Sequence, residues 1–332
     1  MQIDKKRLVI ICMSLFSGLS LASESFSNEA TSIETARADS DFAFSGEYIG
    51  TILHHNCCQN VGIQVAALGD GKYTGMMYQN GLPGNGWNGK DRSVLNGNVN
   101  AGVATLKSDT VSFQLKGVNA KAYANDQLIG CLRKVTRTST SMHACPPACA
   151  TVLFDGTHTR NFKNGRISED GYLEVGTELI PTYRDFLLHL EFRTPYMPAA
   201  RSQNRGNSGV YINSRYEVQI LDSFGLEGKF NECGALYRFK PADQNMAFPP
   251  LVWQTYDIRF RSPRFDENEN KIANARITVA HNNVIVQNDV ELPNKTGAGK
   301  KEGTTRLPIK LQDHGSSVHF RNIWIVDFEN RR

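Results

Sequence analysis

Short segments of alternating apolar and polar residues, separated by turn residues, fill this 332-residue chain from Phe42 onward. Successive side chains of a β-strand point to opposite faces, so this pattern predicts strands with one buried face. No stretch shows the periodicity of a helix of ten or more residues. The chain is therefore expected to be all-β, with antiparallel strands packed in layers.

The strands fall into two groups. In the first, Gly62–Leu68 and Lys72–Tyr78 flank a Gly-Asp-Gly turn, which favours a hairpin because Asp-Gly tolerates positive φ. The second group has longer strands and predicts a two-sheet sandwich. The expected organisation is a signal peptide at 1–22, a disordered segment at 23–41, a small β domain at 42–137, a linker at 138–150 and a β-sandwich at 151–328.

The first residues have the layout of a cleavable secretory signal. Lys5, Lys6 and Arg7 precede an apolar stretch, and Ser20-Leu21-Ala22 supplies small residues for cleavage. We therefore expect a secreted or periplasmic protein. No apolar run reaches the length needed to span a bilayer, so membrane insertion is not expected. The net charge of +4 is too balanced for a nucleic-acid reader.

Six cysteines remain after such cleavage: Cys57, Cys58, Cys131, Cys145, Cys149 and Cys233. An even number in an oxidising compartment favours disulfides, whose connectivity the sequence does not give. The alternative is zinc, because His54, His55 and His143 lie near four of these cysteines, Cys57, Cys58, Cys145 and Cys149. The spacings fit neither usual zinc-finger pattern, so disulfides are preferred.

Acids, amides and a histidine cluster in the second half. Glu217 and Gln219 alternate with Val218 and Ile220, which predicts a polar face opposite the core. By the same alternation Asp222 faces the core, so it is either a catalytic residue beyond the end of the strand or a buried structural acid. The other polar residues expected on this face or at its rim are His189, Glu191, Arg193, Asn207, Tyr211, Tyr237, Gln312, Asp313 and His314.

These motifs carry a resemblance. Residues 151–328 resemble the 3-keto-disaccharide hydrolase domain family, whose members are concanavalin A-like jelly-roll sandwiches. The matching segments are Leu153–Gly156, Tyr183–Phe186, Gly206–Tyr211, Tyr216–Asp222, Leu311–Gly315 and Phe320–Trp324. Residues 42–137 resemble a small β module often found before this domain. The Lys- and Gly-rich stretch 294–305 departs from the family pattern as an enlarged loop.

The resemblance implies a carbohydrate substrate oxidised at C3 of its sugar ring. A C3 ketone acidifies the C2 hydrogen, so a carboxylate can remove this proton and leave an enolate. The enolate expels the C1 substituent, and water then adds to the enone. We expect Glu217 to be the base and His314 or Asp222 to protonate the leaving oxygen. Arg193, Asn207, Gln219 and Gln312 would bind ring hydroxyls or the enolate, and a divalent cation could replace one of them.

Two other functions fit the same fold class. A conventional glycoside hydrolase needs a second carboxylate near Glu217, whereas Gln219 and Leu221 follow at the expected positions. A non-catalytic sugar-binding protein could stack sugar rings on Trp87, Trp253, Tyr211 or Tyr237. The sequence indicates neither the glycoside cleaved nor the oligomeric state, nor a role for residues 42–137.

Overall fold

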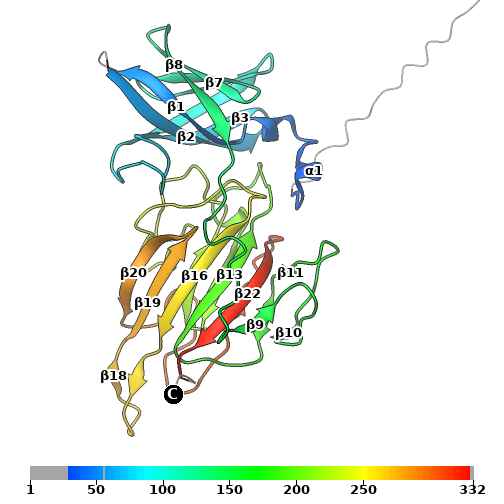
Figure 1. The fold of residues 1–332 in the computed structure, drawn as a ribbon, viewed down its shortest axis with the longest axis vertical. Coiled ribbons are helices and arrows are strands. Elements are labelled where there is room, and N and C mark those ends of the chain that lie inside the picture. The colour runs from blue at the N-terminus through cyan, green and yellow to red at the C-terminus, as the bar shows by residue number, and fades with distance from the viewer. Residues whose placement is uncertain (1–28, 55–56, 330–332) are drawn as a thin grey trace, which may run out of the picture.

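The computed structural model describes residues 29–54 and 57–329 of the chain. These residues form a β-barrel and a β-sandwich, which lie at the top and bottom of Figure 1. The expected all-β fold, with a smaller antiparallel domain before a sandwich, is confirmed. In the described part of the chain, no helix is long and apolar enough to cross a membrane.

The barrel is antiparallel, and its strands pair in chain order until β8 closes on β1. The expected hairpin is present: Asp70 and Gly71 connect two of its strands with positive φ angles of 53° and 70°. Phe113, Leu106 and Tyr48 are fully buried in the barrel core. The strands are β1 (Gly46–His54), β2 (Cys57–Gly69), β3 (Lys72–Gln79), β4 (Arg92–Asn100), β5 (Val103–Lys107), β6 (Ser112–Lys116), β7 (Asn119–Ala124) and β8 (Gln127–Val135).

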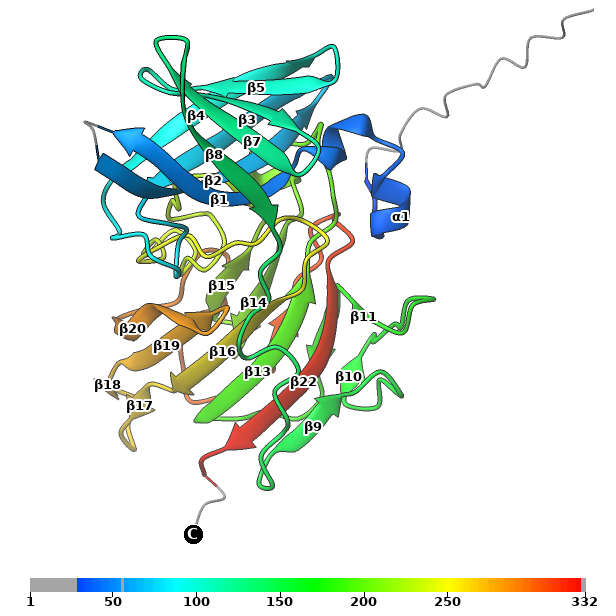
Figure 2. The ribbon, with the colours of Figure 1, turned by 45° about the horizontal axis from the view of Figure 1, so that its top comes forward.

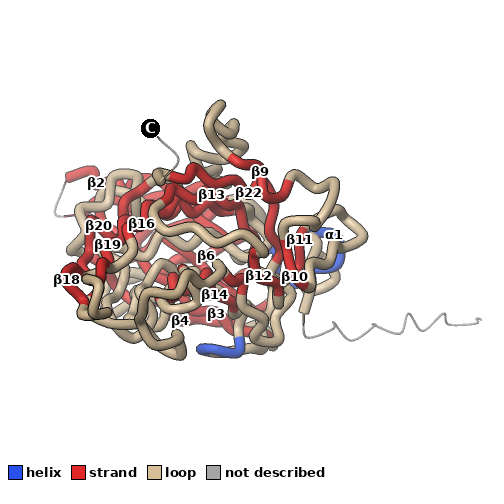
Figure 3. Tube along the Cα trace, turned by 90° about the horizontal axis from the view of Figure 1, so that it is seen from below, coloured by secondary structure: helices blue, strands red, loops and turns tan. Residues whose placement is uncertain are grey.

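The sandwich has two sheets, and Figure 3 shows β13, β16 and β22 in one layer and β14 in the other. The five-stranded sheet has the order β10 (Phe162–Lys163), β12 (Thr177–Leu179), β21 (Lys310–Leu311), β14 (Ser208–Ile212) and β15 (Tyr216–Ile220). The seven-stranded sheet has the order β11 (Leu173–Glu174), β22 (His319–Asp327), β13 (Phe186–Arg193), β16 (Gln254–Arg261), β19 (Ala275–His281) and β20 (Val284–Leu292), with β9 (Thr151–Phe154) paired to β22. A short ribbon joins β17 (Arg264–Phe265) to β18 (Lys271–Ala273).

Both sheets bury the apolar face that the alternation predicted. Phe186, Leu188, Leu190 and Phe192 of β13 are buried in the same core as Val218 and Ile220 of β15. Because the two sheets pack face to face through these side chains, the polar faces of β13 and β15 are the outer faces of opposite sheets. This arrangement decides which polar residues can meet.

The segment before the barrel is ordered where the structure describes it, so the expected disorder of residues 23–41 is wrong for 29–41. It contains α1 (Ile33–Ala36) and the 3₁₀ helix η1 (Ser40–Ala43). Ala30 and Tyr196 exchange two backbone hydrogen bonds of 2.9 Å, and Asp41 accepts one from the Gly71 amide. These contacts tie the segment to both bodies. The predicted signal peptide, residues 1–22, lies outside the described residues.

The linker lies along the outer face of the seven-stranded sheet instead of standing free. The His143 amide donates to Oε1 of Glu191 over 2.6 Å, and Nε1 of Trp324 donates to the Ala144 carbonyl over 3.2 Å. The hydroxyls of Ser139 and Thr255 are 2.7 Å apart. Residues 138–150 therefore cover part of this sheet.

The predicted disulfides do not form in the described part of the chain. Cys58 and Cys131 lie on β2 and β8, which flank β1 on its two sides, so a whole strand separates these cysteines. Cys233 is buried, and its Sγ contacts the Tyr256 hydroxyl at 3.2 Å. The free thiols are those of Cys57, Cys58, Cys131, Cys145 and Cys233.

Candidate active site

A cavity of about 530 Å³ lies on the outer face of the five-stranded sheet. Strands β14 and β15 form its floor, and four loops form its walls. Its lining combines amides, two phenols, an imidazole, a guanidinium and one carboxyl group. The lining residues are Gln203, Asn207, Tyr211, Glu217, Gln219, Tyr237, Arg238, Gly297, Ala298, Gln312 and His314.

Strand β15 places Glu217 and Gln219 on this floor because Val218 and Ile220 point into the core, as the alternation predicted. The free edge of β15 is covered by residues 234–237. The Gly234 amide donates to the Gln219 carbonyl over 3.0 Å, and the Tyr237 amide donates to the Glu217 carbonyl over 3.0 Å. This pairing brings Tyr237 beside Glu217.

Glu217 is 2% exposed, and its carboxyl group receives hydrogen bonds from its neighbours. The Tyr211 hydroxyl, on the adjacent strand β14, donates to Oε2 over 2.7 Å. The Gln219 amide lies 3.2 Å from Oε1; with its nitrogen toward the carboxylate, it donates there and to the Ser208 carbonyl. The Glu217 backbone amide donates to the Thr296 hydroxyl over 2.7 Å.

Burial raises the pKa of Glu217 to about 7, and the hydrogen bond from Tyr211 opposes part of that rise. Burial, followed by the negative charge of Glu217, raises the pKa of Tyr211, so that the phenol remains protonated and can donate. A carboxyl group whose pKa lies near neutral pH is suited to general base catalysis.

The rim of the cavity offers further polar groups. Oε1 of Gln312 is buried and has no hydrogen-bond partner among the described residues. The His314 side chain is exposed at the mouth. Nδ2 of Asn207 donates to the Gln203 carbonyl over 2.7 Å, which holds these two wall residues together.

Comparison with known proteins identifies the family of the second body. The model of the family described as the 3-keto-α-glucoside-1,2-lyase-like domain matches residues 149–326, more than half of the chain. The chain belongs to this family. The lyase-like domain includes every residue that lines the cavity around Glu217. Membership supports a carbohydrate-acting enzyme of the hydrolase type in general. No curated protein matches the chain.

Three solved structures from Parabacteroides distasonis are similar to part of this chain. One, assigned provisionally as a glycosyl hydrolase, is 29% identical with a TM-score of 0.51, over 55% of this chain and 85% of its own. Two others with the same description have identities of 19% and 24% and TM-scores of 0.39 and 0.38. They cover 54% of this chain each and 94% and 99% of their own chains, and add no support for the fold.

Seven of the twelve predicted site residues line the cavity of the lyase-like domain: Asn207, Tyr211, Glu217, Gln219, Tyr237, Gln312 and His314. Their roles remain predictions. The sequence did not single out Gln203, Arg238, Gly297 or Ala298. The last two belong to the stretch 294–305, which forms a wall of the cavity and is more than an enlarged loop. Its departure from the family pattern was the available signal.

Asp222 does not line the cavity, and its surroundings favour the structural alternative. Its side chain is buried, and Oδ2 accepts a hydrogen bond from Nε of Arg205 over 2.7 Å. The strand ends at Ile220, but Asp222 still turns away from the Glu217 face, as strict alternation required. A carboxylate held by a buried guanidinium is poorly placed to protonate a leaving group.

His189, Glu191 and Arg193 do not line this cavity, so the expectation that they share a polar face with Glu217 is wrong. They lie on β13, in the opposite sheet. His189 Nδ1 lies 2.7 Å from Oδ1 of Asp257. Burial favours the neutral form of Glu191, but the hydrogen bonds it accepts, from Arg321 among others, lower its pKa to about 2. Alternation identifies a polar face without saying which sheet carries it.

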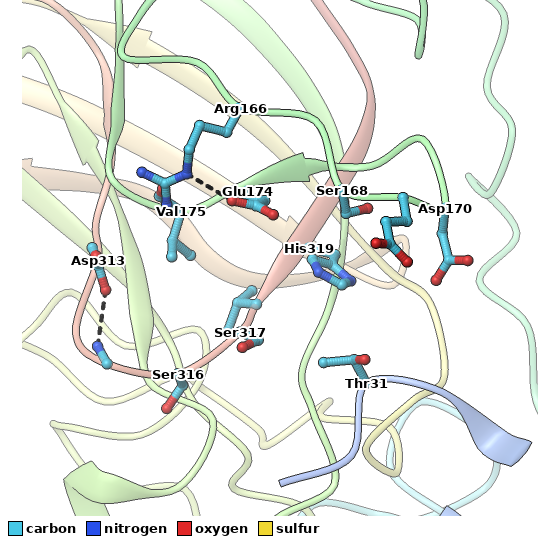
Figure 4. A pocket seen from close by; sticks show the side chains of 13 residues that line it. Thr31, Arg166, Ser168, Asp170, Glu174, Val175, Asp313, Ser316, Ser317 and His319 are labelled. Atoms are coloured by element: carbon cyan, nitrogen blue, oxygen red, sulfur yellow. Dashed lines mark hydrogen bonds and ion pairs between the residues drawn. The ribbon is translucent and has the colours of Figure 1, made fainter. Parts of the chain in front are cut away.

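Asp313 and Arg193 lie at or beside a second cavity, of about 490 Å³. Figure 4 shows Asp313, Glu174 and His319 around this cavity. Asp313 accepts a hydrogen bond from the Gly315 amide over 2.9 Å, which holds it on the far side of the 312–316 turn from Glu217. Nη2 of Arg193 lies 3.5 Å from Nδ1 of His319. Asp313 is therefore also misplaced by the sequence prediction.

Only two of the four aromatic residues expected to stack on sugar line the cavity. Tyr211 and Tyr237 line the cavity, but Trp87 contacts Tyr78 on the barrel, with ring centroids 5.0 Å apart. Trp253 packs against the guanidinium of Arg321, 4.1 Å from its ring centroid. Neither tryptophan lines the Glu217 cavity.

The residues present do not fit the divalent cation considered from the sequence. Glu217 is the one carboxylate among the described residues that line the cavity. Throughout residues 29–54 and 57–329, no three His, Cys, Asp or Glu side chains gather closely enough to hold a metal ion. The groups that the cavity offers for catalysis are therefore its own side chains.

Proposed function

We propose that this protein cleaves 3-keto-glycosides by elimination, with Glu217 as the base. The carboxylate removes the proton from C2, which the neighbouring C3 ketone has acidified, and the electron pair moves into an enolate. The enolate re-forms the ketone, the C1–C2 double bond forms and the C1–O bond breaks. Water then adds across this double bond, with its hydroxyl at C1 and its proton at C2.

The observation that supports this proposal most strongly is the isolation of Glu217. It is a buried carboxyl group with a pKa of about 7, and its neighbours in the cavity are phenols and amides. At neutral pH a group of this pKa is present in both its ionised and its protonated form. It can therefore accept a proton in one step and release it in the next.

The other side chains of the cavity suit the remaining steps. His314, exposed at the mouth, is the group we expect to protonate the leaving oxygen, and it replaces Asp222 in that role. Gln312 has a buried amide oxygen with no partner in the described chain, which can accept a hydrogen bond from a ring hydroxyl. Its amide nitrogen and that of Asn207 can donate to the enolate oxygen, where negative charge develops.

The conventional glycoside hydrolase is less well supported. Retaining and inverting enzymes use two carboxyl groups, about 5–5.5 Å or 6.5–9.5 Å apart, across the scissile bond. Among the described lining residues Glu217 has no such partner. Asp222, the nearest acid in sequence, is occupied by Arg205.

The proposal is tested with Glu217→Gln and a 3-keto-glucoside that carries a chromophoric leaving group. We expect turnover to fall by at least about a hundredfold, because a neutral amide cannot accept the C2 proton. Glu178→Gln, on β12 and outside the cavity, is the matched control and should retain turnover. Near-normal turnover by Glu217→Gln would remove it from the role of base.

We also propose that the protein is exported. The support is the cationic and apolar pattern of residues 1–22, with small residues at the cleavage position. Determination of the N-terminal residue of the protein isolated from its cells tests this. A mature chain that begins at Ser23 agrees with export, whereas a chain that retains Met1 in the cytoplasm contradicts it.

A further inference from the structure

The barrel contacts the sandwich through the two loops that also form walls of the Glu217 cavity. Residues 194–207 join β13 to β14 and contribute Gln203 and Asn207. Residues 221–253 join β15 to β16 and contribute Tyr237. Figure 2 shows loops of this part of the chain, in yellow-green, between the barrel and the sandwich strands.

Arg205 is the residue at which these elements meet. Its Nη1 donates to the carbonyl of Ala67, on barrel strand β2, over 3.0 Å. Its Nε donates to Oδ2 of Asp222 over 2.7 Å, and its own carbonyl accepts a hydrogen bond from the Asp222 amide over 3.1 Å. Asp222 lies two residues after the end of β15, the strand that carries Glu217.

This junction is shielded from water. Arg205 is 6% exposed and Asp222 is 3% exposed. Separation of a buried ion pair leaves each charge uncompensated, which is strongly unfavourable. The pair therefore holds both side chains in a defined position. The guanidinium is planar and donates in fixed directions, which allows it to bind Ala67 and Asp222 at the same time.

The junction lies directly behind the substrate cavity. Arg205 stands between the two wall residues Gln203 and Asn207, and its side chain points away from the cavity toward the barrel. Asn207 donates to the Gln203 carbonyl, and the amides of both residues lie within 3.2 Å of the Gln219 amide on the cavity floor. A shift of Arg205 would therefore move the wall and the floor together.

We propose that the barrel is a structural part of the active site, which holds residues 203–207 in their substrate-binding position through Arg205. Arg205 is a positioning residue in this arrangement and does not touch the substrate. The inference rests on the proposed function, because that function identifies the substrate. The position of residues 203–207 does not depend on it.

The test compares Arg205→Lys with Arg92→Lys. Lysine keeps a positive charge for Asp222 but lacks the planar fork that reaches both partners. Arg92 also donates from the barrel to a loop carbonyl of the sandwich, that of Glu227 over 2.7 Å, but at the exposed rim of the interface. Each variant thus weakens one hydrogen bond between the barrel and a loop of the sandwich. Arg205→Lys does so behind the cavity, and Arg92→Lys does so away from it.

For Arg205→Lys we expect KM for a 3-keto-glucoside to rise about tenfold and kcat to change less than about threefold, because substrate positioning is lost while the base is kept. Arg92→Lys should leave KM unchanged. An Arg205→Lys protein that is less heat-stable but has the wild-type KM would overturn the inference. An equal rise of KM in Arg92→Lys would also overturn it, since the effect would then belong to the whole interface.

Hydrogen exchange gives a readout that does not depend on turnover. Amides of residues 203–207 should exchange faster in Arg205→Lys than in the wild-type protein, and wild-type protection there would contradict the inference. If Arg205→Lys does not fold, Asp222→Asn keeps the shape of the junction without its charge and should change exchange in the same direction. A wild-type protein that is inactive on 3-keto-glucosides would refute the proposed function and leave this exchange test valid.

Discussion

Burial and hydrogen bonding act in opposite directions on the proton of Glu217. Burial favours the neutral acid, whereas the Tyr211 hydroxyl, 2.7 Å from Oε2, stabilises the carboxylate. The result is a pKa of about 7, against about 4.3 for an unperturbed glutamate. The folded protein therefore prefers protonated Glu217 in weakly acidic solution, and the base becomes available as the pH rises through neutrality.

The pH profile of catalysis follows from this balance. We expect kcat/KM for a 3-keto-glucoside to increase with pH and to level off above about pH 7, as Glu217 loses its proton. Tyr211→Phe removes the hydrogen bond that favours the carboxylate, so the midpoint should move to higher pH. A midpoint that stays in place, or moves to lower pH, would contradict the assignment of the profile to this pair.

Individual side chains were predictable where alternation alone determines their direction. Glu217 and Gln219 face away from the core because Val218 and Ile220 face into it, and local sequence shows this. The partner of Asp222 was not predictable in this way. Arg205 meets it through a buried ion pair between segments 17 residues apart, and nothing in the local pattern specifies that distance.

Strand β14 limits the space beneath the Glu217 carboxyl group. It pairs with β15 in the antiparallel direction, and Gly209 lies opposite Gln219. A Cβ atom at Gly209 would lie 2.7 Å from Oε1 of Glu217 and 3.2 Å from Oε1 of Gln312. Glycine at this position therefore leaves room for the side chains of Glu217 and Gln312 against the backbone of β14.

Gly209→Ala should therefore lower kcat/KM by at least about tenfold, because the added methyl group displaces the carboxylate from its position. The control is Gly303→Ala, since a Cβ atom there would have no neighbour within 4 Å. Steady-state kinetics on both proteins, with circular dichroism to confirm folding, make the comparison. Equal activity of the two variants would show that the carboxylate does not depend on this contact.

The strands themselves were largely predictable, but their distribution between sheets was not. The segment Asp185–Thr194 has the expected alternation and becomes β13, yet its polar face lies on the other side of the sandwich from β15. Alternation has a period of two residues and is the same in either sheet. Only the long-range pairing of β13 with β16 and β22 decides the side, and that pairing has no local signature.

The barrel and the sandwich share buried residues although their strands form separate sheets. Tyr196 and Leu251, from loops of the sandwich, are buried in the same apolar cluster as Tyr73 of the barrel. Oε1 of Glu47 in the barrel forms an ion pair of 2.6 Å with Arg137, whose guanidinium lies 4.9 Å from the ring centroid of Phe248. Separation of the two bodies would expose these groups.

We therefore expect thermal unfolding to be one cooperative transition. Neither body can keep its full core without the other, so the calorimetric and van 't Hoff enthalpies should agree. Scanning calorimetry of the whole chain measures both. Two resolved transitions, one for each body, would contradict this coupling.

The most direct test of the proposed chemistry is the exchange of the C2 hydrogen with solvent. The wild-type protein, incubated with a 3-keto-glucoside in D₂O, should transfer deuterium to C2 of the recovered sugar, as measured by NMR. Glu217→Gln should transfer none above the uncatalysed rate, while it still binds the sugar. A wild-type protein that releases the C1 group without any C2 deuterium, in product or in recovered substrate, would show that C2 proton abstraction is not the route.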